Sequence, residues 1–495
     1  MDVFAQQRTW ERAYRLSLSQ LACLGRHTVT GLICTAGRQW QERQVELWIA
    51  TTEIPEAPGH PFYRRLNELL ATHGFDRHVE GLCAKFYHDQ LGRPGIPPGV
   101  YFRMLLIGYF EGIDSERGIA WRCADSRTLS AFLGYSPKET TPDHSSLSKI
   151  RNRIDLETHQ EVFTWVLKVL AGSKLLKGKT LGVDATTLEA NAAMRSIIRR
   201  DTAESYDEFL TGLAKASGIE TPTREDLVKV DKTRKNKASN KDWFNPNDPD
   251  AKITQMKDGR THLAHKAEHA VDLETGAIVG VTLQPADRGD TTSLWATVAK
   301  AAENLREVAD DPETAECLEQ EPVQEAVLDK GYHSNDTCRD LAEAEIRGYV
   351  SEPERGRRKW QGKTAERDAV YANRRRIRGK RGKALLRKRG ELLERPFAHC
   401  YETGGMRRTH LRGHPNILKR LLIHVAGFNL ALVMRAAFGI GKPRRVQDGL
   451  GGLLGCVLSR IVPLWHRVTA TWRPQIVLCG LMARIGRQPR LHRAA

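Results

Sequence analysis

Apolar residues between positions 61 and 172 recur at three- and four-residue spacing, which is the period of amphipathic helices. Glycines and prolines separate the main segments, PFYRRLNELLATHG, HVEGLCAKFYHDQ, PPGVYFRMLLIGYFEG and SERGIAWRCADSRTLSAFLG. A further helix begins within TPDHSSLSKIRNRI, where Thr141 or Asp143 can cap the free N–H groups of the first turn. The pattern predicts an all-α N-terminal domain over residues 51–173.

The period changes from helical to strand-like after position 174. In KTLGVDATTLEA, Leu181 and Val183 alternate with Gly182 and Asp184. Side chains alternate between the two faces of a strand, so Asp184 is expected on the face opposite the two apolar residues. This strand marks the predicted start of a second domain, over residues 174–440.

The rest of this domain alternates strands with helices. THLAHKAEHAVDLETGAIVGVTLQPA predicts two strands joined by a tight turn at 273–276, and the helix after them has Asp290 as its expected cap. The segment Glu325–Leu328 predicts a buried strand that ends at Asp329, and a helix and a strand follow it. The order strand, strand, strand, helix, strand, helix, strand predicts an α/β fold with a mixed sheet flanked by helices.

Other parts of the chain have weaker or different patterns. Residues 195–260 are charged and lack apolar periodicity, so we expect an insertion or a mobile loop there. Residues 416–437 are strongly amphipathic, which predicts a helix packed against the sheet. Residues 1–50 form an unassigned N-terminal extension, and residues 441–495 form a basic C-terminal tail.

Composition adds a polyanionic partner to this picture. The 77 Lys and Arg residues outnumber the 60 Asp and Glu residues, which gives a formal charge of +17. Such an excess favours nucleic acid as the partner, with an anionic membrane surface as the second candidate. The nine cysteines lie far apart without a CxxC pair, so we expect reduced cysteines and no zinc finger.

Nothing in the sequence predicts a membrane or secretory protein. The longest apolar run, at 449–465, is interrupted by Ser459 and Arg460 and is shorter than the roughly 20 residues that a spanning helix needs. Met1 is followed by acidic and polar residues rather than by a basic segment with an apolar core. We therefore expect a soluble cytoplasmic protein without membrane association.

Two basic stretches are candidates for contacting DNA. The helix within residues 141–154 presents Lys149, Arg151 and Arg153, which either lie on DNA in helix-turn-helix fashion or form a solvated basic face. Residues 374–389 contain many basic residues and no acid, which indicates a phosphate-contacting surface, a disordered, solvated loop, or both, because a basic loop can become ordered only on DNA. The DNA-binding candidates there are Arg374, Arg375, Arg376, Arg378, Lys380, Arg381, Arg387 and Lys388.

Three separated acids suit a divalent-metal site. Mg²⁺ prefers oxygen ligands and often binds one or two carboxylates together with waters and phosphate oxygens. Asp184 and Asp329 are expected at strand ends, and Glu394 lies in the segment RKRGELLERPFAH. A single aspartate at a strand end is more often a cap or turn residue, so the interpretation depends on the combination.

Four stretches resemble the DDE transposases of bacterial insertion sequences, which belong to the RNase H-like (retroviral integrase) superfamily. They are HPFYRRLNELLATHGFD with GRPGIPPGVYFRMLLIGYFEGIDSERGIAWR, then GVDATTLEAN, LDKGYHS and ERPFAHCYETGGMRRTHLRG. The resemblance extends over roughly residues 50–440. It implies an RNase H-like mixed sheet after an all-α domain, with Asp184, Asp329 and Glu394 as catalytic acids that bind two Mg²⁺ ions, for which Mn²⁺ can substitute.

Each acid has rivals in the sequence. Asp201 and Glu189 are alternatives for the first acid, but neither follows an apolar strand. Asp290 and Asp287 are alternatives for the second, but they are better explained as helix-cap and turn residues. Glu391 competes for the third position.

The end of the fourth stretch departs from the family pattern. The resemblance favours Glu394 over Glu391, because relatives have ERPF around their glutamate. Many relatives have Lys or Arg seven residues after that glutamate, whereas this chain has Tyr401. Arg407 or Arg408 are candidates for the DNA contact that such a basic residue would make.

The resemblance also implies a function. A transposase of this kind binds the terminal inverted repeats of its own element as double-stranded DNA, cleaves a strand with Mg²⁺, and joins the freed 3′-OH to target DNA. The helical region 61–172 would supply repeat recognition or dimer contacts, and the working complex would be a homodimer in a bacterial cytoplasm, associated with the nucleoid. The alternatives are a catalytically inactive DNA-binding repressor or relic, and a related metal-dependent nuclease that cleaves without joining.

Overall fold

The computed structural model describes residues 59–446, apart from 89–94, 235–237, 257–258, 313, 319–320, 355 and 357. All described residues belong to the structural unit that begins at Ala57. The predicted N-terminal extension over 1–50 lies outside the described residues, and so does most of the predicted C-terminal tail over 441–495.

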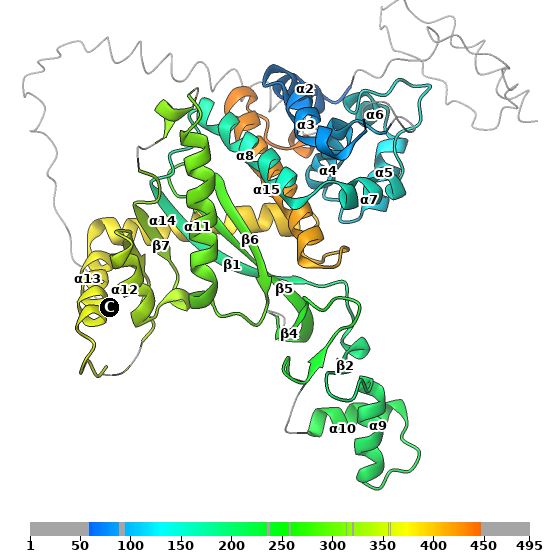
Figure 1. Ribbon diagram of the computed structural model, residues 1–495, viewed down its shortest axis with the longest axis vertical. Helices are drawn as coiled ribbons and strands as arrows, with labels where there is room; N and C mark the ends of the chain where they lie inside the picture. The colour runs from blue at the N-terminus through cyan, green and yellow to red at the C-terminus, as the bar shows by residue number, and fades with distance from the viewer. Residues whose placement is uncertain are drawn as a thin grey trace, which may run out of the picture. The chain divides into compact units, whose positions relative to one another are not determined.

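Helices make up the described chain from Pro61 to Gly172, as the sequence predicts (Figure 1). Asp143 caps one of them by accepting a hydrogen bond from the backbone N–H of Ser146. The most apolar helix, α4, is buried from Gly99 to Phe110 and forms the centre of this bundle. The helices are α2 (Pro61–Thr72), α3 (Phe75–Cys83), η3 (Ala84–Phe86), α4 (Pro98–Glu111), α5 (Glu116–Asp125), α6 (Arg127–Phe132), α7 (His144–Arg153) and α8 (Leu156–Gly172).

One mixed sheet follows, which confirms the predicted α/β fold. Its strands are β1 (Thr180–Glu189), β4 (Lys252–Gln255), β5 (Thr261–Asp272), β6 (Ile278–Pro285), β7 (Glu325–Leu328) and β8 (Arg347–Val350). The central strand β1 is antiparallel to β5 and parallel to β7, and β7 is parallel to β8. The long strand β5 pairs through its other edge with β4 and then with β6. The domain boundaries themselves stay a prediction.

Different helices cover the two faces of the sheet (Figure 1). α11 (Asp290–Ala309) packs on one face, and α14 (Lys380–Phe397) crosses the other. A Cβ atom on Gly182 of β1 would lie only 2.5 Å from Cδ1 of Leu393, so a side chain there would push α14 away. Because Gly182 and Asp184 point to the same face, α14 lies over the face that carries Asp184.

The described part of segment 195–260 folds around a small core of its own, so the expectation of a mobile loop is wrong. Trp243 packs edge-on against Tyr206 and Phe209. This core consists of a few scattered aromatic and aliphatic residues rather than a periodic apolar face, which is why the hydrophobic pattern does not reveal it. The elements are η4 (Met194–Ser196), β2 (Ile198–Arg199), α9 (Tyr206–Ala216), α10 (Arg224–Thr233) and β3 (Trp243–Phe244).

The basic stretch 374–389 is helical, so the alternative of a disordered loop is also wrong. It spans the end of α13 (Thr364–Arg378) and the first half of α14. The apolar residues Val370 and Leu393 anchor these two helices in the fold. The remaining elements of this region are η5 (Ala315–Cys317), η6 (Lys330–Tyr332), α12 (Asn335–Glu343) and the π-helix η7 (Ala398–Glu402).

The last long helix, α15 (His414–Phe438), precedes the short η8 (Pro443–Val446). We predicted one apolar face packed on the sheet, but α15 is buried around most of its circumference because it lies between β6 and the helices α4 and α8. Asn429 of α15 pairs with both backbone groups of Ile278, at 3.0 and 2.8 Å, and thereby satisfies the edge of β6. Among the described residues, α15 is the one helix long and apolar enough to cross a membrane, and 72% of its apolar window is buried within the fold.

Candidate active site

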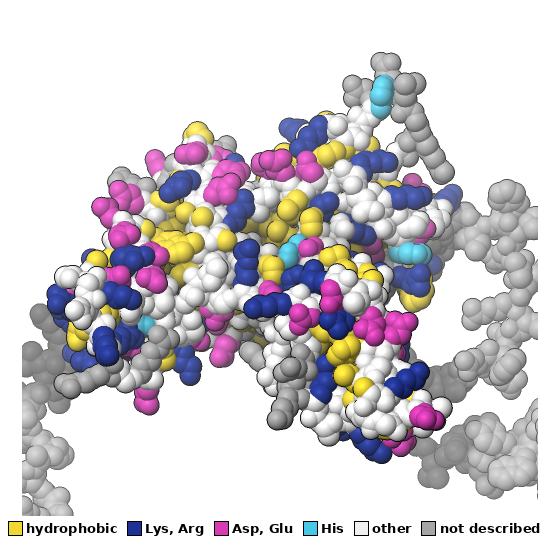
Figure 2. Space-filling view, turned by 60° about the horizontal axis from the view of Figure 1, so that its bottom comes forward, with side chains coloured by type: hydrophobic (Ala, Val, Ile, Leu, Met, Phe, Trp, Pro, Cys, Tyr) yellow, Lys and Arg dark blue, Asp and Glu magenta, His cyan; other side chains and the backbone are white. Residues whose placement is uncertain are grey.

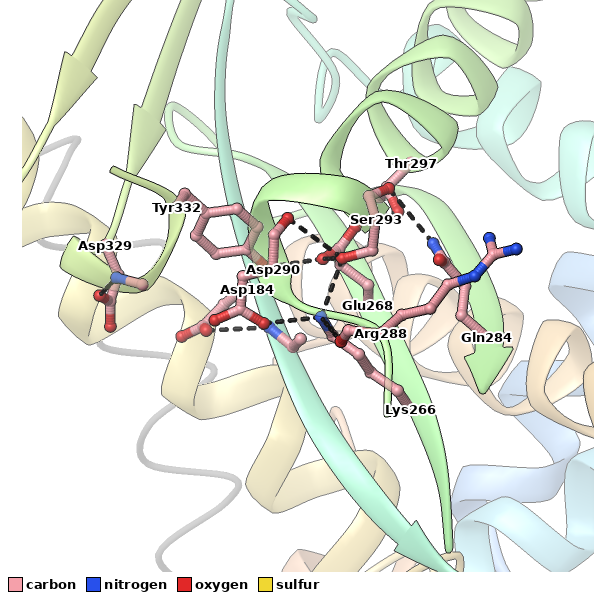
Figure 3. A network of polar contacts seen from close by, with 12 residues as sticks. Asp184, Lys266, Glu268, Gln284, Arg288, Asp290, Ser293, Thr297, Asp329 and Tyr332 are labelled. Atoms are coloured by element: carbon pink, nitrogen blue, oxygen red, sulfur yellow. Dashed lines mark hydrogen bonds and ion pairs between the residues drawn. The ribbon is translucent and has the colours of Figure 1, made fainter. Parts of the chain in front are cut away.

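Two acids lie at equivalent positions on the neighbouring inner strands β1 and β7. β1 and β7 run parallel, and their last paired residues are Val183 and Leu328. Asp184 and Asp329 follow this pair directly, so both carboxylates lie where the two strands stop pairing (Figure 3). The structure therefore brings together the two aspartates that the sequence singles out.

A backbone N–H group orients each aspartate. Oδ1 of Asp184 accepts from the N–H of Ala185 at 2.8 Å, and Oδ1 of Asp329 accepts from the N–H of Gly331 at 2.7 Å. The second oxygen of each carboxylate, Oδ2, faces the guanidinium of Arg389 on α14. Its Nη2 atom lies 2.8 Å from Oδ2 of Asp184 and 3.9 Å from Oδ2 of Asp329. The two carboxylates therefore converge on one cation.

This site has more negative charge than Arg389 neutralises. Burial raises the pKa of the Asp184 carboxyl above its ordinary value, and the nearby carboxylates of Asp329 and Asp290 act in the same direction. The positive charge of Arg389 and the N–H of Ala185 oppose them without reversing the shift. A cation of higher charge placed between the carboxylates would therefore be bound favourably.

Asp290 belongs to this neighbourhood and is not the cap that the sequence suggests. Gly289 is the N-cap of α11, and Asp290 is its first helical residue. Oδ1 of Asp290 accepts from Nζ of Lys266 at 2.6 Å. A Cβ atom on Gly331 would lie 2.4 Å from Oδ2 of Asp290 and 3.8 Å from Oδ1 of Asp329. The absence of a side chain on Gly331 therefore lets Asp290 approach the second aspartate.

A buried carboxylate lies beneath the site and connects three elements (Figure 3). Glu268 of β5 is fully buried, and its Oε1 accepts from the hydroxyls of Ser293 and Tyr332, each at 2.7 Å. The hydroxyl of Thr297 donates to its other oxygen, and Nζ of Lys266 donates to the Ser293 hydroxyl at 2.9 Å. Because Tyr332 belongs to the turn that Asp329 begins, this network ties the turn to α11 and β5.

The structure does not bring Glu394 to the two aspartates. Glu394 is exposed on α14, whereas Arg389 of the same helix faces the site. The two residues are five positions apart, which rotates Glu394 by about 140° around the helix axis from Arg389. Among the described residues, no three His, Cys, Asp or Glu side chains converge closely enough to hold a metal ion. The role of Glu394 as third acid stays a prediction.

The neighbouring candidates are also occupied elsewhere. Glu391 is exposed and forms an ion pair with Arg395 on the same helix. Tyr401, at the position where many relatives have a basic residue, is fully buried, and its hydroxyl lies 2.5 Å from Nε2 of His269. Tyr401 therefore packs the interior of this chain instead of facing DNA.

The basic residues predicted on α7 have different environments. Lys149 and Arg153 are exposed. The Arg153 guanidinium lies over the ring of Tyr87, 4.9 Å from its centroid. Arg151 is 11% exposed, and its Nε donates to Glu116 of α5 at 2.8 Å. Arg151 thus joins two helices of the fold, which leaves Lys149 and Arg153 available for a partner.

Three of the predicted DNA-binding arginines on α13 and α14 are bound within the fold. Arg374 donates two hydrogen bonds to Glu352, at 2.6 and 2.7 Å. Nε of Arg376 donates to a backbone carbonyl of β8 at 2.8 Å. Nη2 of Arg381 donates to Glu325 of β7 at 2.6 Å. These side chains hold α13 and α14 against the sheet edge.

The other predicted DNA-binding residues of this stretch are exposed on the two helices. They are Arg375, Arg378, Lys380, Arg387 and Lys388. Figure 2 shows dark-blue Lys and Arg side chains spread over the visible face with Asp and Glu among them. Basic and acidic side chains are thus mixed on this face. Because the fold leaves these five side chains exposed, they are the stronger DNA-binding candidates of the stretch.

Arg407 and Arg408 lie next to the C-terminal half of β1. Nη1 of Arg407 donates to the Thr186 hydroxyl at 3.1 Å, and Glu402 binds the other side of its guanidinium. Nε of Arg408 lies 3.7 Å from Oε1 of Glu189. The structure therefore places both arginines along the strand of Asp184, with Arg407 held more firmly.

Sequence reasoning missed Arg389, Lys266 and Glu268, and it set Asp290 aside as a helix cap. The signal for Lys266 and Glu268 was present, because charged residues alternate with apolar ones inside the long strand segment THLAHKAEHAVD. Charged residues in a strand that is buried on both faces require partners. No comparable signal in the chain indicates that Arg389, among its many basic neighbours, faces the acids.

Part of the chain matches a protein-family model. Residues 52–153 match the model of a family described as a transposase domain (DUF772), which includes helices α2 to α7. No curated protein matches the chain. The match lies entirely outside the site of Asp184 and Asp329, so it is independent of the geometry above. It supports a transposase family and a DNA-processing function for this chain.

Proposed function

We propose that this chain is a DDE transposase with an RNase H-like catalytic domain. It would bind the terminal inverted repeats of an insertion sequence and catalyse Mg²⁺-dependent strand cleavage and strand transfer. The observation that carries the proposal is the convergence of Asp184 and Asp329 on one cation, in a chain with a match to a transposase domain. The strand order supports the RNase H-like domain, because the strand of the first acid lies at the centre of a mixed sheet.

The residues at this site fit a divalent cation. Both Oδ2 atoms already face a single positive group, and both Oδ1 atoms are fixed by backbone N–H groups. Mg²⁺ commonly binds through one or two carboxylates and completes its shell with waters and phosphate oxygens. Asp184 and Asp329 would hold Mg²⁺ or Mn²⁺ in this way, and Glu394 is the third ligand that the resemblance implies.

The chemistry would be two displacements at phosphorus. Bound Mg²⁺ would supply an activated oxygen nucleophile and stabilisation of the leaving oxygen. Asp184 and Asp329 would hold the cation that places the scissile phosphate, since carboxylates alone would repel it. Water first replaces the 3′-oxygen at phosphorus, and the freed 3′-OH then replaces an oxygen of the target phosphodiester. Each step forms one P–O bond, breaks one and transfers one proton, so it needs no covalent enzyme intermediate.

The DNA would contact basic residues that the fold leaves exposed. Arg387 and Lys388 lie on α14, the helix that covers the face of Asp184, while Lys149 and Arg153 lie on α7 within the matched transposase domain. Contacts to phosphates by such residues give affinity that falls steeply with salt. Two element ends must be held together for transfer, so the working complex would be a homodimer.

A second candidate function is supported by two observations. Arg389 neutralises part of the acidic site, and Glu394 points away from it. Both features suit a DNA-binding repressor or relic that has lost catalysis. A related nuclease that cleaves without joining would use the same two aspartates.

One assay separates these functions. The chain is incubated with Mg²⁺ and a labelled end of its own element, and the wild type is compared with Asp184→Asn. Asp201→Asn is the matched control, because Asp201 is an exposed carboxylate paired with Arg199 in the insertion. We expect cleavage and joining to be lost in Asp184→Asn with DNA binding retained, and both to persist in the control. Binding without cleavage in the wild type would identify the repressor, and cleavage without joining the nuclease.

A further inference from the structure

The position of Arg389 has a functional consequence for the acidic site. Its side chain is 12% exposed, and a single nitrogen, Nη2, faces Oδ2 of both Asp184 and Asp329. These are the two oxygens that backbone N–H groups leave unbound. The guanidinium therefore lies where the two carboxylates would present their oxygens to a metal ion.

The guanidinium is only partly satisfied in this position. Its Nε and Nη2 atoms are both buried without a hydrogen-bond partner among the described residues, so Nη2 contacts the carboxylates through ion pairs alone. A guanidinium has five N–H donors and binds best to a partner that accepts two of them in parallel, such as a carboxylate or a phosphate. A buried N–H group without an acceptor is unfavourable. Arg389 is therefore bound less strongly in this position than it would be by a partner that accepts two of its hydrogen bonds.

We propose that Arg389 is an internal cation that competes with divalent metal for Asp184 and Asp329, so that metal enters only when the guanidinium leaves. The proposal rests on the proposed function, because it concerns the same two acids. It assigns a role to a residue that neither the resemblance nor the basic run distinguishes.

Competition follows from the geometry and the charges. One positive group cannot share this space with a divalent cation, because like charges about 4 Å apart repel strongly even at the effective dielectric of a protein surface. Without Arg389 the two carboxylates would repel each other, so the guanidinium stabilises the empty site while it lowers the affinity for metal. Released from the acids, Arg389 could pair with a phosphate through two parallel hydrogen bonds.

The test measures Mn²⁺ affinity of the full chain without DNA, from the electron paramagnetic resonance signal of free Mn²⁺. Arg389→Gln removes the competing charge, and we expect its affinity to exceed that of the wild type by roughly ten- to a thousandfold. Arg389→Lys keeps the charge and should stay much closer to the wild type. Arg395→Gln is the matched control, because it removes an exposed positive charge from the same helix. Its affinity should change less than about threefold.

A double variant, Asp184→Asn with Arg389→Gln, locates the ion. Loss of the gained affinity in the double variant supports the proposal, provided that circular dichroism shows a folded chain. An affinity of Arg389→Gln equal to or below that of Arg395→Gln overturns it, and so does undetectable binding in every variant. The measurement uses no DNA, so it is independent of the labelled-end assay. A gain in Mn²⁺ affinity in Arg389→Gln, together with no cleavage or joining by the wild type in that assay, would count against the transposase activity and leave the competition intact.

Discussion

The hydroxyl of Tyr332 is expected to hold the second aspartate in place. Tyr332 lies in the turn η6, of which Asp329 is the N-cap, and its hydroxyl donates to Glu268 at 2.7 Å. Burial, together with the adjacent Glu268 carboxylate, raises the pKa of Tyr332, so the hydroxyl keeps its proton and acts as the donor. Tyr332→Phe removes this one hydrogen bond and leaves the ring in the core.

The size of the effect follows from the partners. A hydrogen bond to a charged group contributes about 1.5–3 kcal/mol to stability. Ser293 donates to the same oxygen of Glu268 at 2.7 Å, so the carboxylate keeps one donor in the variant. We therefore expect a loss of about 1.5 kcal/mol, the lower end of this range. If it is confined to the turn, this loss makes local opening about tenfold more frequent.

Hydrogen exchange reads this opening directly. The amides of Gly331, Tyr332 and His333 all bond within the turn, so their exchange should accelerate about tenfold in Tyr332→Phe. Tyr101→Phe is the control, because its buried hydroxyl lies 3.1 Å from His159, whose pKa burial lowers to about 4 and which is therefore neutral near pH 7. It should leave the turn unaffected. Unchanged exchange in Tyr332→Phe would refute the anchoring role.

Three further predictions concern the site, the core and the DNA surface. Gly331→Ala places a methyl group 2.4 Å from Oδ2 of Asp290, so Asp290 or the turn of Asp329 must move. The Mn²⁺ affinity, measured by electron paramagnetic resonance, should fall below that of the wild type. An affinity equal to that of the wild type would contradict this. Burial lowers the pKa of His159 to about 4. Between pH 6.5 and 4 this histidine is therefore protonated in the unfolded state and neutral in the folded state. The free energy of unfolding should then fall by about 1.4 kcal/mol for each pH unit of acidification within this window. Urea unfolding at pH 7, 6 and 5 should show this loss of stability. In His159→Gln the free energy of unfolding should depend on pH less steeply, by the contribution of one proton. Arg387→Gln should reduce the salt slope of DNA binding by about one, whereas Arg374→Gln, whose guanidinium is bound to Glu352, should not, and equal slopes would contradict the distinction.

The two aspartates could be found from the sequence because the signal is local. An apolar run that ends in an acid predicts a strand with a carboxylate at its end. This is correct for Asp329 but wrong for Asp184, because β1 continues to Glu189 along β5. Val183 and Leu328 nevertheless have the same position before the two acids. That β1 and β7 are neighbours is not a local property. It depends on which strands pair, and only the resemblance to a known fold led us to expect that β1 and β7 are neighbours.

The third acid illustrates where sequence reasoning stops. The motif ERPF identifies Glu394 by its neighbours in the chain, but not by the direction in which its side chain points. That direction depends on how α14 rotates against the sheet, which is set by the contact of Leu393 with Gly182 and by the burial of Pro396. With these residues facing inward, Arg389 faces the acids and Glu394 faces solvent. A shift of α14 when DNA and metal bind would be needed for Glu394 to act as the third ligand.

Asp290 shows why a buried network cannot be assembled from local patterns. An acid at the start of a helix is most simply explained as its cap, and this explanation uses only the neighbouring residues in the sequence. The structure instead gives the cap position to Gly289 and pairs Asp290 with Lys266, which is buried in β5 and has no other carboxylate within hydrogen-bond distance among the described residues. A buried lysine is tolerable only with such a partner, so the requirement that places Asp290 beside the site comes from β5. The charge of Asp290 is thereby already partly neutralised, which makes it a weaker metal ligand than Asp184 and Asp329, whose Oδ2 atoms face only an exchangeable guanidinium.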